Sequence, residues 1–387
     1  MRQETFTLSA KELQRVAVIS SCVKGELACA RAAELLAITP RHVKRLKARY
    51  RQGSAAALAH ANRGRPSPRR LPERVRARIL HLARTRYAGF NDHHLCEKLV
   101  EQEGFSLSRE TLRRLLRSAG IGSPRKRRPP AHRQRRSRSA REGELIQLDG
   151  SPHDWLEGRG PQLTALGMQD DASSKILAAR FFPSETTEGY FHLLQRLLRR
   201  FGVPLAFYGD RSGIFVRNDE HWTIEEQLAG RRQPTQFGRA LEQLGITFIA
   251  AQSPQAKGRV ERLWGVLQDR LTSELRLAQA GDLDSANRVL RAFIADYNRR
   301  FARTPRDAAK AWRSAPDDLD RICCFVHPRI VSNDNIVQWE GRRLQIHPQP
   351  RRFSFAGAQV LLCQALDGRV SLYYGDTRLE HTAAAGG

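Results

Sequence analysis

The stretch Ser253–Arg270, S-P-Q-A-K-G-R-V-E-R-L-W-G-V-L-Q-D-R, predicts a loop that leads into a helix. Pro254 restricts the residue before it to extended geometry. Apolar residues then recur at helical spacing, so one face of the helix is buried. They are Val260, Leu263, Leu267 and Leu271. Glu261 lies off this apolar stripe, and its next-turn neighbours Gly265 and Gln268 are small or polar, so its carboxylate is able to face an open cleft.

Two further acids end apolar runs that predict short buried strands. Asp149 follows residues 144–148, and Asp210 follows residues 205–209. Each acid alone is more often a turn former or a surface residue. Three carboxylates from separate elements suit two Mg2+ ions, with Mn2+ as a substitute, because hard cations prefer oxygen ligands and such a pair catalyses phosphoryl displacement. We therefore predict that Asp149, Asp210 and Glu261 are catalytic and bind metal.

The motif S-P-x-x-K-G-x-x-E at residues 253–261, preceded by Asp149 and Asp210, resembles the DDE catalytic core of retroviral integrases and insertion-sequence transposases. Within that group, the N-terminal segments are most similar to those of the ISNCY transposases. The resemblance implies a ribonuclease-H-like core. It also implies a DDE-type polynucleotidyl transferase that binds the terminal inverted repeats of an insertion sequence, cleaves DNA and transfers the strand.

The region between Asp210 and Glu261 is longer than is usual in this superfamily. We attribute the excess to a polar insertion at residues 216–236, whose acids compete for the place of the third ligand. These acids are Asp219, Glu225 and Glu226. None of them lies in a helix start flanked by Ser-Pro and Gly, which favours Glu261. Lys257 and Arg259 are expected to hold the terminal phosphate beside it.

The 387-residue chain is 40% hydrophobic and carries a formal net charge of +26. Residues 1–142 hold 34 Lys and Arg against 11 Asp and Glu, so nearly all of the excess positive charge is N-terminal. This predicts binding of double-stranded DNA by the N-terminal part. The six cysteines include no C-x-x-C pair, and no stretch is long and apolar enough to span a membrane. We expect a cytoplasmic, nucleoid-associated bacterial protein.

A helix-turn-helix is predicted within residues 8–52, with a second helix at 40–50 capped by Thr39. The exposed face of that helix is basic, which suits a recognition helix in the major groove. The residues expected to contact DNA are Arg41, Lys44, Arg45 and Lys47. The alternative is an amphipathic helix whose charged face is only solvated.

Two more basic segments follow. The R-G-R-P core of the linker, with Arg63 and Arg65, resembles an AT-hook that enters the minor groove, although a plain Pro-rich spacer explains it equally well. Three helices are then predicted at 72–86, 91–103 and 108–119, the last carrying Arg113 and Arg114 for DNA. Three metal-binding residue types cluster in the second of these helices, but no Cys-x-x-Cys follows them, and we assign them no metal. They are His93, His94 and Cys96.

The predicted fold is multidomain, with all-α helix-turn-helix modules, an α/β ribonuclease-H-like core and a small all-β barrel. In chain order these parts are a helix-turn-helix module at 1–61, a basic linker at 62–70, a second helical module at 71–121, a disordered basic linker at 122–143, the catalytic core at 144–302 and the barrel at 325–380. The barrel is expected to bind DNA or another protomer.

We predict a transposase that acts on element ends and target DNA as a homo-oligomer assembled on DNA. Two alternatives remain open. A transposase-derived repressor would need the basic modules but not the three acids. A ribonuclease-H-like nuclease would need the acids but not the paired modules.

Overall fold

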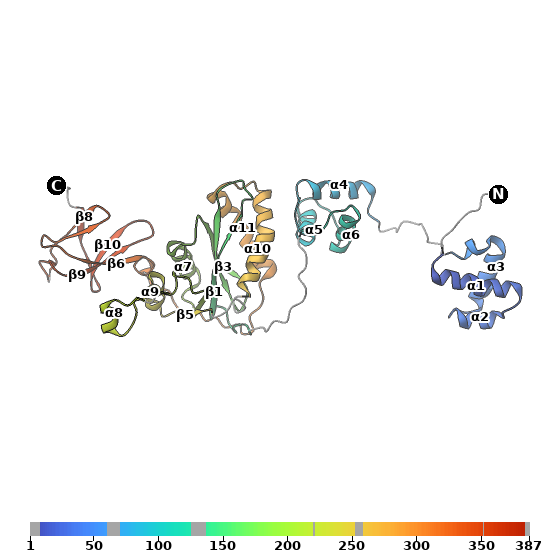
Figure 1. Cartoon of the computed structure of the whole chain (residues 1–387), viewed down its shortest axis with the longest axis horizontal. Helices are drawn as coiled ribbons and strands as arrows, with labels where there is room; N and C mark the ends of the chain where they lie inside the picture. The colour runs from blue at the N-terminus through green and yellow to red at the C-terminus, as the bar shows by residue number, and fades with distance from the viewer. Residues whose placement is uncertain are drawn as a thin grey trace. The chain divides into compact units, whose positions relative to one another are not determined.

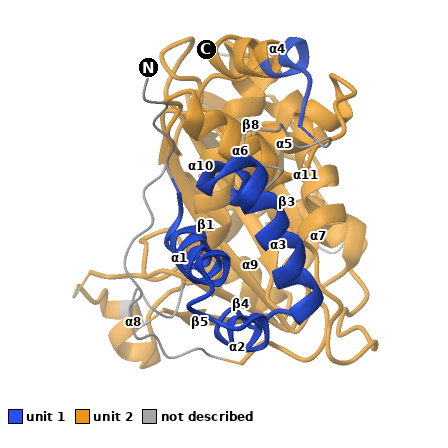
Figure 2. Cartoon of the chain, turned by 90° about the vertical axis from the view of Figure 1, so that its right-hand side faces the viewer, with its two compact units in different colours: residues 1–76 blue, residues 77–387 orange. Residues whose placement is uncertain are grey.

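The chain divides into two compact units, residues 1–76 and residues 77–387 (Figure 2). The structure is a computed structural model, and it describes residues 8–59, 70–124, 137–219, 221–251, 258–350 and 352–383. The predicted AT-hook-like residues Arg63 and Arg65 lie outside these ranges. None of the helices described is both long enough and apolar enough to cross a bilayer.

The first unit contains the predicted helix-turn-helix. Its elements are α1 (Ala10–Lys24), α2 (Cys29–Leu35), α3 (Pro40–Gly53) and a short 3-10 helix (Ala55–Leu58). Thr39 caps α3, because its hydroxyl accepts a hydrogen bond from the His42 backbone N–H at 3.3 Å. Val43 and Leu46 are buried in the small core against α1 and α2, and Tyr50 packs at its edge. This packing leaves the basic face of α3 exposed, as the sequence predicts.

Three further helices form the second helical module, which is α4 (Glu73–Arg84), α5 (Asp92–Glu101) and α6 (Arg109–Ser118). The Asn91 side chain accepts hydrogen bonds at the start of α5, and the Ser108 side chain does so at the start of α6. Asn91 and Ser108 are also the first residues of the helices predicted at 91–103 and 108–119. The apolar faces of these helices are buried, whereas Arg113 and Arg114 on α6 are 61% and 80% exposed.

A five-stranded sheet in the order β3-β2-β1-β4-β5 forms the centre of the second unit. Its strands are β1 (Leu145–His153), β2 (Leu163–Asp170), β3 (Ile176–Phe182), β4 (Ala206–Gly209) and β5 (Thr247–Ala250). The first three strands form an antiparallel meander, and β4 and β5 run parallel to β1. This is the strand order of the predicted ribonuclease-H-like core.

Helices cover both faces of this sheet (Figure 1). One apolar cluster joins α7 (Thr187–Phe201) and α9 (Gln236–Gln243) to the Ile146 and Leu148 side of β1. A second cluster joins α10 (Val260–Leu277) and α11 (Leu283–Phe301) to the other face. Because strand side chains alternate between faces, the residues that flank these apolar positions on β1 point toward α10. These flanking residues are Gln147, Asp149 and Ser151.

Two asparagines of α11 cover the edge strand β3. The Asn298 amide pairs with both backbone groups of Ile176 at 2.8 Å, and the Asn287 amide pairs with both backbone groups of Phe181. Exposed strand edges recruit other strands, so this pairing closes one edge of the core sheet.

The strand that carries Asp149 is longer than the sequence predicts. Instead of ending before Asp149, β1 continues to His153 and pairs with β2 throughout. The pairs between β1 and β4 end at Gln147. Pro152 has no backbone N–H to donate, but because it lies beyond these pairs, no hydrogen bond to β4 is lost. Asp149 therefore lies inside a strand, where pairing with Gly167 of β2 holds its backbone.

The basic segment predicted to be disordered as far as residue 143 is ordered from residue 137. The Ser139 N–H donates to Asp171 at 2.8 Å, the Gly143 N–H donates to Asp170 at 3.0 Å, and Lys175 pairs with Glu142 at 2.8 Å. The prediction was wrong here because carboxylates at the β2–β3 turn satisfy the backbone N–H groups of this segment. At the other end, Cys323 belongs to the same apolar cluster as α7, so the core packing extends past residue 302.

The C-terminal part is the predicted small all-β unit, built from two antiparallel sheets. One sheet has the order β11-β10-β9-β6 and the other has the order β12-β8-β7. The strands are β6 (Phe325–Ile330), β7 (Ile336–Trp339), β8 (Arg342–Ile346), β9 (Gln359–Gln364), β10 (Val370–Tyr374), β11 (Thr377–Leu379) and β12 (His381–Ala383). Both sheets contribute to one apolar core, in which Val337 and Leu344 meet Leu362 and Leu372.

Candidate active site

Helix α10 is locked along strand β1 by three hydrogen bonds. The Val260 N–H donates to the Gln147 side chain at 3.2 Å, the Trp264 indole N–H donates to Asp149 at 3.0 Å, and the Gln268 amide donates to the Ser151 hydroxyl at 3.2 Å. From one hydrogen bond to the next, the donor moves four residues along the helix and the acceptor moves two residues along the strand. Four helical residues rise about 6.0 Å and two strand residues rise about 6.6 Å, so the two elements run parallel with matched spacing.

Trp264 fixes both the position and the surroundings of Asp149. Asp149 pairs with Gly167 on β2, and a Cβ atom at Gly167 would lie 2.9 Å from the Trp264 ring. The indole therefore occupies the space over Gly167 while its N–H holds one carboxylate oxygen of Asp149. Sequence reasoning missed this role of Trp264. A signal was present in the polar residues at alternate positions of β1, Gln147, Asp149 and Ser151, since buried polar side chains need hydrogen-bond partners on the element packed against them.

Glu261 lies in the first turn of α10, one turn before Trp264, and its side chain is exposed. Negative charge is favourable at this end of a helix, because the free N–H groups give it a partial positive charge. Among the residues that the structure describes, none comes within 4 Å of a Cβ atom placed at Gly265, one turn further along α10.

Asp210 follows β4 directly, beside the strand that carries Asp149. The parallel pairs Leu145–Ala206 and Gln147–Tyr208 share one offset. Continued by two residues, this offset places Asp210 opposite Asp149, and adjacent strands lie about 4.8 Å apart. The Ser212 N–H donates to Asp210 at 2.9 Å, which fixes the carboxylate in a local turn.

The three predicted acids thus come from two adjacent strands and the start of the helix packed on them. Within the described ranges, no group of three or more His, Cys, Asp or Glu is gathered closely enough to hold a metal ion. The donors nevertheless suit Mg2+ chemically, since all are carboxylate oxygens.

Two of the three competing acids of the insertion, Asp219 and Glu226, have partners within the insertion. Glu226 caps α8 (Ile224–Ala229), pairs with Arg217 and accepts a hydrogen bond from the Gln233 N–H at 2.8 Å. These backbone hydrogen bonds and the Arg217 charge hold the pKa of Glu226 below its usual value. Asp219 pairs with Arg217 at 2.8 Å. The Glu225 side chain lies outside what the structure describes.

Of the two cations expected beside Glu261, Lys257 lies outside the described residues. Arg259 forms an ion pair with the buried Asp171 carboxylate, which also accepts a hydrogen bond from Gln147 at 2.5 Å. The structure therefore places Arg259 in a network that fixes the start of α10, rather than over the acids.

The second helical module contacts the same helix through α5. Arg270, 8% exposed, pairs with Glu97 at 2.7 Å. The buried His94 ring and the Lys98 ammonium each lie 2.7 Å from Glu274. Although burial alone would raise it, the hydrogen bonds from His94 and Lys98 hold the pKa of Glu274 below its ordinary value. These contacts join α5 to the helix that carries Glu261.

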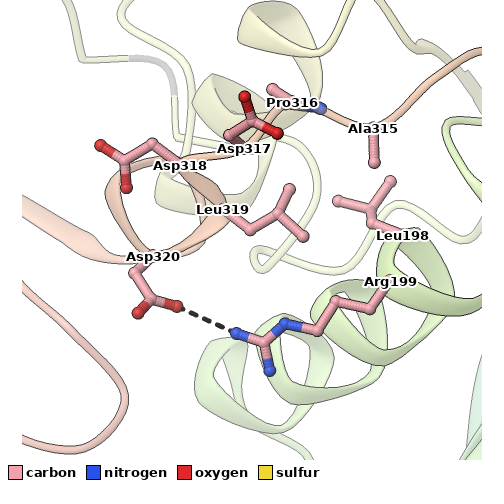
Figure 3. Close-up of a pocket in the computed structure, with 8 residues that line it drawn as sticks. All are labelled: Leu198, Arg199, Ala315, Pro316, Asp317, Asp318, Leu319 and Asp320. Carbon is pink, nitrogen blue, oxygen red and sulfur yellow. Dashed lines mark hydrogen bonds and ion pairs between the residues drawn. The ribbon is translucent and has the colours of Figure 1, made fainter.

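A pocket lies between the end of α7 and residues 315–320, where Arg199 pairs with Asp320 at 3.1 Å (Figure 3). None of the three predicted acids lines it.

On the helix-turn-helix, Arg41, Lys44 and Arg45 are exposed on the outer side of α3, and Lys47 is half-buried.

The helix-turn-helix module and the second helical module precede an α/β core, an arrangement typical of DNA-binding proteins. The comparisons with known proteins name the family more closely. A homeodomain-like domain model matches residues 42–116, and a helix-turn-helix domain model matches residues 14–67. A putative transposase y4bF from Sinorhizobium fredii is 37% identical, covering 95% of this chain and 79% of its own length. The transposase for insertion sequence IS1202 from Streptococcus pneumoniae is 30% identical, covering 96% and 86%. The chain belongs to the insertion-sequence transposases.

Among solved structures, the catalytic core domain of HTLV-2 integrase in complex with magnesium covers 40% of this chain and 86% of its own. Its sequence identity is 17% and the TM-score is 0.29, which is too low to establish a shared fold.

Proposed function

We propose that this transposase is a DDE-type polynucleotidyl transferase of the ISNCY type, in which Asp149, Asp210 and Glu261 hold two Mg2+ ions. The observation that carries the proposal is the shared register. Continued two residues past the last β1–β4 pair, Gln147–Tyr208, this register would bring Asp210 opposite Asp149, and Trp264, one turn after Glu261, donates a hydrogen bond to Asp149. When bound, the ions would activate a water or a 3' hydroxyl and stabilise the leaving oxygen, and Mn2+ would substitute for them.

The chain's own residues hold the site in shape. Trp264 orients Asp149, the Ser212 N–H orients Asp210, and the first turn of α10 presents Glu261. We further propose that Lys257 contacts the terminal phosphate. Because a mobile element has two ends and one active centre joins one of them, the working form would be a homo-oligomer assembled on DNA near the nucleoid.

A joining assay tests this function. The purified chain, incubated with Mg2+ and a duplex that carries the terminal inverted repeat, is expected to release a 3' end and join it to a target plasmid. Cleavage without joining would support a nuclease instead. Tight binding with neither reaction, in Mg2+ or in Mn2+, would support a repressor.

The helix-turn-helix is expected to select the repeats through α3. Replacing Arg41, Lys44 and Arg45 together by Ala should weaken binding to the repeat more than binding to random duplex. Each lost phosphate contact should also reduce the slope of log K against log salt by about 0.9. Fluorescence anisotropy over a salt series measures both effects. The matched control removes the exposed basic residues Lys11 and Lys24 of α1. An equal loss of affinity for both duplexes would indicate that α3 contacts phosphates without reading the bases.

A further inference from the structure

A fourth carboxylate lies beside the strand that carries Asp149. A Cβ atom at Gly150 would be 2.6 Å from Oε2 of Glu185, so the Glu185 carboxylate occupies the space that any larger residue would fill. Gly150 lies in the middle of β1 and pairs with Leu166. A glycine weakens a strand, and it commonly marks a place where another group approaches the backbone closely.

The Glu185 carboxylate is held by a rigid partner. Tyr190 on α7 is fully buried, and its ring makes edge contacts with Phe215 and Phe237. Its hydroxyl donates a hydrogen bond to Oε1 of Glu185 at 2.6 Å. Because the aromatic core fixes the ring, the hydroxyl fixes the carboxylate, although Glu185 itself lies in the exposed loop before α7.

Tyr190 lies in a region of negative charge. Burial, followed by the negative charges of Glu185, Asp149 and Asp210, raises the pKa of Tyr190 well above its ordinary value. The phenol therefore keeps the proton that it donates to Glu185. Glu185 comes from a loop that sequence reasoning did not connect with the site.

We propose that Glu185, positioned by Tyr190 in the space over Gly150, is a further positioning residue of the active centre that strengthens divalent-cation binding at Asp149 and Asp210. The proposal rests on the proposed function. A negative charge next to a cation site attracts the cation, and an outer carboxylate also orders the water that completes the coordination. The loss of such an outer partner typically weakens metal affinity about 10- to 100-fold.

Mn2+ binding to the full chain without DNA tests the proposal, measured from the free-ion signal in electron paramagnetic resonance. Glu185→Gln should weaken binding about 10- to 100-fold. Gly150→Ala should act in the same direction, because the added methyl displaces the carboxylate. Tyr190→Phe should have a smaller effect, since it releases the carboxylate without removing it. The Mn2+ concentration for half-maximal joining should rise in the same order.

Glu188→Gln is the matched control, since Glu188 is an exposed acid on the first turn of α7 that lies 3.7 Å from the His192 ring. Its Mn2+ affinity should equal that of the unmodified chain. If Asp149→Asn loses Mn2+ binding while Glu185→Gln retains full affinity, this inference is overturned and the proposed function stands. If Asp149→Asn also binds Mn2+ normally, the proposed function fails, and the role of Glu185 fails with it.

Discussion

Replacing Asp149, Asp210 or Glu261 by the corresponding amide is expected to abolish metal-dependent cleavage and joining while leaving DNA binding unchanged. The substitution keeps the size of the side chain but removes the charge that binds the cation. Residues that act as a unit are non-additive, so each single variant should lose nearly as much activity as the triple variant. Rates of strand joining on a pre-cleaved end measure the effect, and anisotropy on the same duplex measures binding.

Asp219→Asn is the matched control, because Asp219 is an exposed acid of the insertion that pairs with Arg217. Its joining rate should stay close to that of the unmodified chain. Trp264→Phe should fall between these cases, since it keeps the ring over Gly167 but removes the N–H that holds Asp149. If Glu261→Gln retained full joining activity while Glu225→Gln lost it, the start of α10 would not carry the third acid.

Much of the core could be predicted because its elements have strong local signals. The helices predicted at 91–103 and 108–119 begin within one residue of α5 and α6. The continuation of β1 through Asp149 could not be predicted, because Gly150 and Pro152 are poor strand formers. Pairing with β2 over the whole strand overrides that local preference.

The supporting contacts of the site could not be predicted either, because they join distant parts of the sequence. Nothing local connects Trp264 with Asp149 or Glu185 with Gly150. The basic segment before β1 shows the same limit. Its composition indicates disorder, yet carboxylates at the β2–β3 turn bind its last residues. The sequence pattern thus predicts three acids but not the groups that contact them.

The contact between α5 and α10 leads to the second large expected effect. Glu97→Gln should destabilise the second unit by about 3–5 kcal/mol, because it leaves the buried Arg270 without its carboxylate partner. Glu97 also pairs with Arg300 at 3.3 Å. Thermal unfolding of the full chain, followed by circular dichroism, measures the loss. Glu110→Gln is the control on α6, since its pair with Arg114 is exposed and such pairs contribute at most about 1 kcal/mol.

The contribution of the Glu97 carboxylate to stability should decrease as the pH falls. Burial alone would raise the pKa of Glu97, but hydrogen bonding to Arg270 and the charges of Arg270, Arg300 and His93 hold it below its ordinary value of 4.5. A carboxylate with a lowered folded pKa stabilises the protein above its unfolded pKa and loses that contribution as the pH falls through the folded value. Glu97→Gln should therefore flatten the loss of stability on acidification below about pH 4.5.

A double replacement separates charge from packing at this contact. Combining Glu97→Leu with Arg270→Met removes both charges and keeps much of the apolar volume, so stability should return to that of the unmodified chain or exceed it by about 1–4 kcal/mol. Recovery would show that the cost of Glu97→Gln comes from a buried unpaired guanidinium. If Glu97→Gln unfolded at the same temperature as Glu110→Gln, α5 would not be docked on α10 in solution. The second helical module would then be free to move independently of α10.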